Sequence, residues 1–179
     1  MNKIVNKLYI VGSAGSGKST LALKLSKKLR IEHYDLDLIR LPLTGIKRTF
    51  EERMPLVNEI AKKKKWIAEG VYVAWTKELL ESANQIIWLD TPLHKTIPRI
   101  FKRFIHQKIT GTERYGIKST LRMTRALIKH HYPDSKFKDS IEDKHITKEK
   151  VKNALTPYMD KVLILKSNNE IKNYIKELL

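Results

Sequence analysis

Residues Gly12-Ser13-Ala14-Gly15-Ser16-Gly17-Lys18-Ser19 fit the pattern G-x-x-x-x-G-K-[ST] at every position. The apolar run from Leu8 to Val11 precedes them and predicts a buried strand, while the four-residue spacing of leucines over residues 18–30 predicts an amphipathic helix. Glycines permit positive φ, so backbone N–H groups of such a loop can turn toward an anion at the helix N-terminus. A Gly/Ser-rich turn that binds nothing would not need the complete match in this context. The sequence therefore predicts a phosphate-binding loop, or P-loop.

The side chains at the end of this loop have separate expected roles. Lys18 is expected to reach the β- and γ-phosphates of a nucleotide and to take part in catalysis. Ser19 is expected to offer its hydroxyl to Mg²⁺, and Thr20 to hydrogen-bond the α-phosphate. The predicted nucleotide-binding residues are Gly12, Ser13, Ala14, Gly15, Ser16, Gly17, Lys18, Ser19 and Thr20.

The rest of the chain alternates apolar strands with helices. Five strands separated by helices indicate an α/β fold, with a parallel sheet covered by helices on both faces and right-handed crossovers. Thr91 and Pro92 are expected to be the N-cap and the first residue of the helix after the fourth strand. No linker or repeat divides residues 1–179, so we expect one domain. The predicted strands are residues 8–11, 31–35, 66–70, 85–90 and 161–166, and the predicted helices are 18–30, 50–65, 77–82, 92–108, 118–131, 147–156 and 169–178.

Composition excludes several classes of protein. The absence of Cys excludes disulfide scaffolds, thiolate metal sites and a Cys nucleophile, and no apolar run is long enough to span a membrane. We expect a soluble cytoplasmic domain that is a monomer or a homodimer. The net charge of +17, from 36 Lys+Arg against 19 Asp+Glu, leaves two interpretations open: a nucleic-acid partner, or lysines spread over solvated faces.

The P-loop alone does not separate kinases from GTPases and motor ATPases. The Asn-Lys-x-Asp motif with which GTPases usually read their base is absent from the sequence. A chain of 179 residues has little room for a motor domain, whereas a small-molecule kinase fits that length.

Several segments in combination resemble adenylate-kinase-related proteins, and more closely the group labelled DNA topology modulation proteins (FlaR-like). The resemblance covers nearly the whole chain. It implies a nucleoside-monophosphate-kinase-like P-loop fold with strand order 2-3-1-4-5 and a short lid, binding ATP and Mg²⁺. Labels within the group name either kinases or proteins of DNA topology and regulation. The segments that carry the resemblance are Tyr9–Leu21, Leu36-Asp37, Trp66-Ile67-Ala68-Glu69-Gly70-Val71-Tyr72 and Ile86–Asp90.

Acidic residues near the predicted strand ends are candidates for metal binding. By the resemblance, Glu69-Gly70 stands where adenylate kinases have an Asp-Gly pair, whose acid orients Mg²⁺ through water. Glu is one methylene longer than Asp, which is a departure from that pattern. Asp90 follows an apolar strand as a Walker B acid does, or could instead cap the next helix, so the Walker B acid is left open between Glu69 and Asp90. The expected metal residues are Ser19, Asp35 and Glu69.

Asp35-Leu36-Asp37 resembles the Asp-x-Asp that ends the second strand in shikimate-kinase-like enzymes. Alternation along a strand would place both carboxylates on the same side, where one can serve a metal and the other a substrate hydroxyl. Asp37 is therefore expected to be catalytic, as a base or an orienting group for the acceptor hydroxyl. The alternative is a helix N-cap and a solvated acid.

A basic segment follows the fourth strand. Residues 95–129 hold ten Lys or Arg against Glu113, so about half of the excess charge of the chain lies here. In related kinases this region, here about 99–130, is the lid whose arginines close on ATP and the transferring phosphoryl group. An exposed basic face is the alternative. The expected catalytic arginines are Arg99, Arg103 and Arg114, with Arg122 a weaker candidate.

The acceptor region is expected at about residues 38–65, which contain Arg40, Arg48 and Arg53. Specificity for AMP is not favoured, because Gly70 is followed by Val71-Tyr72-Val73 rather than the Pro-Arg of adenylate kinases. The sequence favours an ATP-dependent phosphotransferase acting on a nucleotide or another small acceptor. The alternative is an ATP-binding regulatory or DNA-associated protein with little or no kinase turnover.

Overall fold

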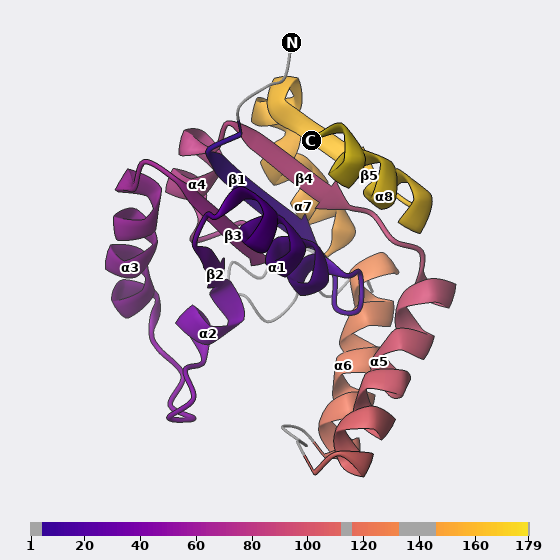
Figure 1. Cartoon of the computed structure of the whole chain (residues 1–179). Helices are drawn as coiled ribbons and strands as arrows, with labels where there is room; N and C mark the ends of the chain where they lie inside the picture. The colour runs from indigo at the N-terminus through magenta and orange to yellow at the C-terminus, as the bar shows by residue number, and fades with distance from the viewer. Residues whose placement is uncertain (1–4, 112–115, 133–145, 179) are drawn as a thin grey trace.

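A five-stranded parallel sheet forms the centre of the computed structural model, which describes residues 5–111, 116–132 and 146–178 (Figure 1). The strand order is β2-β3-β1-β4-β5, and each neighbouring pair is parallel. Both the predicted α/β class and the predicted order 2-3-1-4-5 are confirmed. The strands are β1 (Lys7–Gly12), β2 (His33–Asp35), β3 (Trp66–Gly70), β4 (Gln85–Leu89) and β5 (Val162–Leu165).

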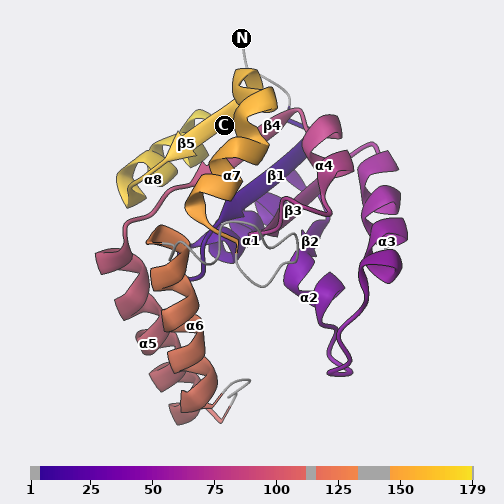
Figure 2. The same ribbon diagram turned by 180° about the vertical axis from the view of Figure 1, so that it is seen from behind.

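Helices cover both faces of this sheet because its central strands are apolar on both faces. Leu8 and Ile10 of β1 pack under one set of helices, and Tyr9 and Val11 pack under the other, and all four side chains are buried. Figures 1 and 2 show the two layers from opposite sides. One layer consists of α1 (Lys18–Leu29) and α8 (Asn168–Glu177), and the other of α3 (Phe50–Lys62), α4 (Lys77–Ser82) and α7 (Lys148–Leu155).

Two long helices, α5 (Leu93–Ile109) and α6 (Ile117–His131), pack against each other and project from the sheet (Figures 1 and 2). The expected cap of α5 is wrong: Pro92 is the N-cap and Leu93 the first helical residue. Thr91 is buried and donates instead to the Ser16 carbonyl at 3.4 Å. In the part of the chain that the structure describes, no helix is long and apolar enough to cross a membrane.

The short helix α2 (Leu36–Arg40) and the 3₁₀-helix η3 (Thr156–Lys161) were not predicted. The Asp35 carboxylate caps α2 by accepting a hydrogen bond from the Asp37 N–H at 2.9 Å. Strand β2 therefore ends at Asp35, and Asp37 lies in the first turn of a helix. The expectation that strand alternation aligns the two carboxylates is wrong for that reason.

Candidate functional site

The loop between β1 and α1 has the backbone that its glycines predict. Gly15 and Gly17 have φ of 74° and 102°. A Cβ on Gly15 would also lie 2.7 Å from the Thr96 carbonyl oxygen, and one on Gly12 would lie 2.8 Å from Ser16 Oγ. The loop therefore packs closely against the first turn of α5 at Gly15. A residue with a side chain would not fit at Gly12 or Gly15 without a shift of the neighbouring atoms.

Lys18 lies at the N-terminus of α1, where its side chain folds back over the loop. It is 9% exposed, and its Nζ donates to the Ser13 carbonyl at 3.1 Å. No side chain caps α1, whose N-cap is Gly17. The N–H groups of the first helical turn and the Lys18 ammonium therefore lie together at an end of the helix dipole that favours anions.

The Ser19 hydroxyl donates to Glu69 Oε1 at 2.6 Å, which joins α1 to the end of β3. Glu69 is 2% exposed, and burial raises the pKa of its carboxyl, against the opposing effects of Lys18 and the Ser19 hydrogen bond. Asp35 lies opposite Glu69 in the β2–β3 register. Burial is also the main cause that raises the pKa of Asp35, followed by the charge of Asp37. The structure thus brings together Ser19, Asp35 and Glu69, the three residues predicted to bind metal.

These oxygen donors suit Mg²⁺, which proteins bind through one or two carboxylates together with substrate phosphates. Among the described residues, no group of three or more His, Asp or Glu side chains forms a ready-made metal site. Asp90, the other Walker B candidate, instead forms an ion pair with Lys148 at 2.7 Å. Glu69, rather than Asp90, is therefore the carboxylate in contact with the P-loop serine.

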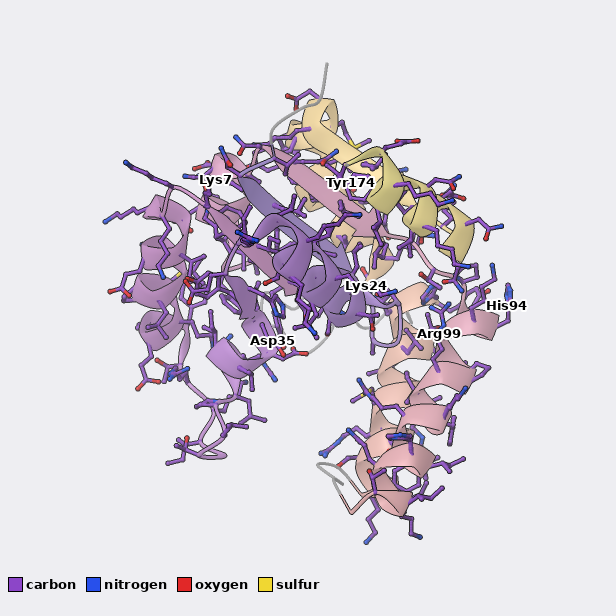
Figure 3. The ribbon with its side chains drawn as sticks, in the orientation of Figure 1. Lys7, Lys24, Asp35, His94, Arg99 and Tyr174 are labelled. Carbon is purple, nitrogen blue, oxygen red and sulfur yellow. The ribbon has the colours of Figure 1, made fainter. Side chains whose placement is uncertain are left out.

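Asp37 is exposed near the same end of the sheet, at the start of α2. Its Oδ1 accepts a hydrogen bond from the Tyr72 hydroxyl at 2.6 Å. Asp37 and Asp35 thus lie on α2 and β2, on one side of the P-loop, and the α5–α6 helices lie on the other (Figures 1 and 3). Tyr72 belongs to the Glu-Gly-x-Tyr segment that carries part of the resemblance. Nothing in the amino-acid sequence predicts that it hydrogen-bonds to Asp37.

The three predicted arginines have different environments. Arg99 is half-buried and donates to the carbonyls of Gly15 and Ser16 at 3.3 and 3.4 Å. Arg103, one turn further along α5, is exposed and contacts Met123 Sδ on α6 at 3.3 Å. The structure thus places Arg99 against the P-loop and Arg103 against the neighbouring helix α6. Arg114 lies outside the described residues.

A cavity of about 340 Å³ lies beside the P-loop, between α1, α5 and α8. Arg99 reaches across it and donates to Asn168 Oδ1 at 2.9 Å, and Figure 3 shows Arg99 at the top of α5 near Lys24 of α1. Asn168 was not predicted, because a surface asparagine at a helix start has the sequence signature of a cap. The lining residues that matter here are Ser16, Gly17, Thr20, Lys24, Arg99 and Asn168.

Comparison with solved structures identifies the fold as that of P-loop kinases. A shikimate kinase from Acinetobacter baumannii in complex with shikimate superposes with a TM-score of 0.54 at 15% identity, covering 98% of this chain and 92% of the kinase. A gluconokinase from Sinorhizobium meliloti 1021 gives a TM-score of 0.53 at 15% identity, covering 97% of this chain and 89% of that protein. At such low identity the likeness establishes the fold alone.

Sequence comparison finds an uncharacterized protein, YqaC of Bacillus subtilis (strain 168), that is 30% identical over 114 residues. The match covers 60% of this chain and 64% of YqaC, so it spans just under two thirds of that relative. No protein-family model matches the chain. The resemblance to the topology modulation group therefore stays a prediction.

Proposed function

We propose that this chain is an ATP-dependent phosphotransferase that acts on a small hydroxyl-bearing acceptor. We also propose that it is an adenylate-kinase-related P-loop protein of the DNA topology modulation (FlaR-like) family. The observation that carries the activity is the contact of Ser19 with Glu69 at 2.6 Å, next to a complete P-loop. A serine hydroxyl and a buried carboxylate held together in this way form the protein side of an Mg²⁺–nucleotide site.

In this proposal, each part of the site has one task. The loop N–H groups and Lys18 bind the β- and γ-phosphates, and Ser19, Glu69 and Asp35 hold Mg²⁺. Bound Mg²⁺ would neutralise negative charge on the phosphate oxygens. The cavity between Thr20, Arg99 and Asn168 is the place for the nucleoside part of ATP, since it opens directly beside the loop.

Asp37 is the group proposed to act on the acceptor, because its carboxylate is exposed near the metal residues. The acceptor oxygen forms a bond to the γ-phosphorus, and the bond from this phosphorus to the β–γ bridging oxygen breaks. The hydroxyl proton passes to Asp37, and ADP leaves with the electron pair of the broken bond. Arg103 and Arg114 remain predicted lid residues in this scheme.

The test is ADP release from Mg·ATP with a panel of nucleosides, nucleoside monophosphates, hydroxy acids and sugar acids. Turnover with one member is expected, and Lys18→Ala should abolish both turnover and ATP binding. Lys27→Ala, an exposed lysine on the same helix, is the matched control and should leave both unchanged. Intact ATP binding in Lys18→Ala, or no turnover with any panel member, would contradict the proposal.

One observation favours the second candidate, a nucleic-acid-associated ATP-binding protein. Helices α5 and α6 carry nine Lys or Arg and no Asp or Glu within their described residues. Binding of duplex DNA through about six phosphate contacts should weaken by about three orders of magnitude between 50 and 200 mM salt. Tight, salt-dependent DNA binding without turnover on the panel would favour this function over the kinase.

A further inference from the structure

Tyr72 joins two parts of the site that are far apart in the sequence. Its hydroxyl donates to Asp37 Oδ1 at 2.6 Å, from the bend that follows β3 to the first turn of α2. The Tyr72 side chain is buried, whereas Asp37 is exposed. The buried Tyr72 hydroxyl thus restricts the rotamers of the exposed Asp37 carboxylate.

The backbone of Tyr72 is fixed by hydrogen bonds from buried side chains. Its carbonyl accepts hydrogen bonds from the hydroxyls of Tyr9, which lies on the central strand, and of Thr76. Both of these residues are 0% exposed. The Tyr72 ring packs against Trp75 with 4.8 Å between ring centroids. The phenol therefore rests on the core of the protein and not on a mobile surface.

Gly70 lets the tyrosine and α2 meet. A Cβ on Gly70 would lie 3.1 Å from the Leu36 Cβ and 3.2 Å from Cδ2 of the Tyr72 ring. These distances are tighter than ordinary van der Waals contacts, so a side chain here would push α2 and the ring apart. The short segment from Glu69 to Tyr72 thus contacts Ser19 at one end and Asp37 at the other.

We propose that Tyr72 is a positioning residue that orients Asp37 toward the phosphoryl acceptor, an inference that rests on the proposed function. A carboxylate has two oxygens that accept hydrogen bonds. The phenol uses Oδ1 and leaves Oδ2 for the acceptor hydroxyl. Catalytic groups need support of this kind because a misplacement of about 1 Å can cost about 100-fold in rate.

The experiment compares the native protein, Tyr72→Phe, Asp37→Asn and the double variant in ADP release with the acceptor that the panel identifies. We expect Tyr72→Phe to lower kcat about 10- to 100-fold while the KM for Mg·ATP stays within twofold. In the Asp37→Asn background, Tyr72→Phe should produce no further loss, because the two residues act as one unit.

Tyr174→Phe is the matched control, since Tyr174 is also buried and donates to a side chain, Gln85 Oε1, at 2.6 Å. Both Phe variants should lower the melting temperature by a few degrees, but only Tyr72→Phe should lower kcat. Thr76→Val, which removes one support of the Tyr72 carbonyl, is a second variant and should lower kcat more modestly.

The outcomes separate this inference from the proposed function. If the native protein turns over a panel compound and Tyr72→Phe keeps kcat within twofold, the positioning role is overturned and the kinase stands. Equal losses from Tyr72→Phe with and without Asp37 overturn it as well, because Tyr72 would then not act through that carboxylate. A native protein that releases no ADP with any panel member overturns both.

Discussion

Ser19 and Glu69 are 50 residues apart in the chain, yet the serine hydroxyl lies 2.6 Å from Glu69 Oε1. The parallel register that sets Glu69 beside Ile10 of β1 brings the glutamate to the end of the strand that leads into the P-loop. Glu69, which stands where the resemblance has the Asp of an Asp-Gly pair, thus contacts the P-loop serine directly.

Replacement of this glutamate tests its proposed role in metal binding. Mg²⁺ should raise the ATP affinity of the native protein. Glu69→Gln should reduce this gain about tenfold or more, because an amide is a poor substitute for a carboxylate next to Mg²⁺. The measurement is an ATP titration with and without Mg²⁺. Asp90→Asn is the control, since Asp90 is paired with Lys148. If Asp90→Asn and not Glu69→Gln loses the effect of Mg²⁺, the Walker B assignment passes to Asp90.

Arg99 and Arg103 should respond differently to truncation, although they share a helix. Arg99 donates to two P-loop carbonyls and to Asn168, so Arg99→Ala should weaken ATP binding about tenfold or more. Arg103→Ala should weaken ATP binding less than Arg99→Ala does, because Arg103 contacts Met123 on α6 and not the P-loop. Calorimetric titration of both variants provides the comparison. Equal losses of ATP affinity in the two variants would show that helices α5 and α6 as a whole, and not the Arg99 contacts, support the nucleotide site.

Gly15 of the P-loop and Gly45 of the loop between α2 and α3 allow backbone strain to be separated from steric crowding. Gly15 and Gly45 have φ of 74° and 79°, but a Cβ meets the Thr96 carbonyl oxygen at 2.7 Å at Gly15 and nothing within 4 Å at Gly45. Gly45→Ala should cost about 1 kcal/mol of unfolding free energy from backbone strain alone. Gly15→Ala should cost about 3 kcal/mol and abolish ATP binding, since the loop must move from α5. Urea unfolding measures both, and equal costs would contradict the close packing of the loop.

The sequence predicts what depends on local pattern and misses what depends on distant partners. Strand Trp66–Gly70 and helix Lys77–Ser82 lie where their apolar patterns predict them, to the residue. Helix α2 escaped prediction because it has five residues, and the carboxylate that caps it also fits a strand end. The hydrogen bond from Tyr72 to Asp37 joins residues that are 35 positions apart in the chain. Helix and strand periodicity relate only nearby residues, so they do not predict this pairing.

His130 provides a pH-dependent prediction away from the proposed metal site. Its side chain is 8% exposed, and its Nδ1 donates to the Ile146 carbonyl at 2.6 Å. Burial is the main cause that lowers the pKa of His130 from 6.5 to about 4, against the opposing effect of that hydrogen bond. Between these two values the unfolded chain binds a proton that the folded protein does not.

The stability that His130 contributes is therefore complete above pH 6.5 and is lost as the pH falls toward 4. The total loss is about 3 kcal/mol, since each pKa unit corresponds to about 1.4 kcal/mol. Urea unfolding from pH 4 to pH 7 should show a shallower dependence in His130→Gln, by up to about 1.4 kcal/mol per pH unit. His106→Gln, at an exposed position on α5, should retain the native slope. Equal slopes in the native protein and His130→Gln would contradict the prediction. They would mean that the folded protein binds a proton at His130 as readily as the unfolded chain does, despite the hydrogen bond to the Ile146 carbonyl.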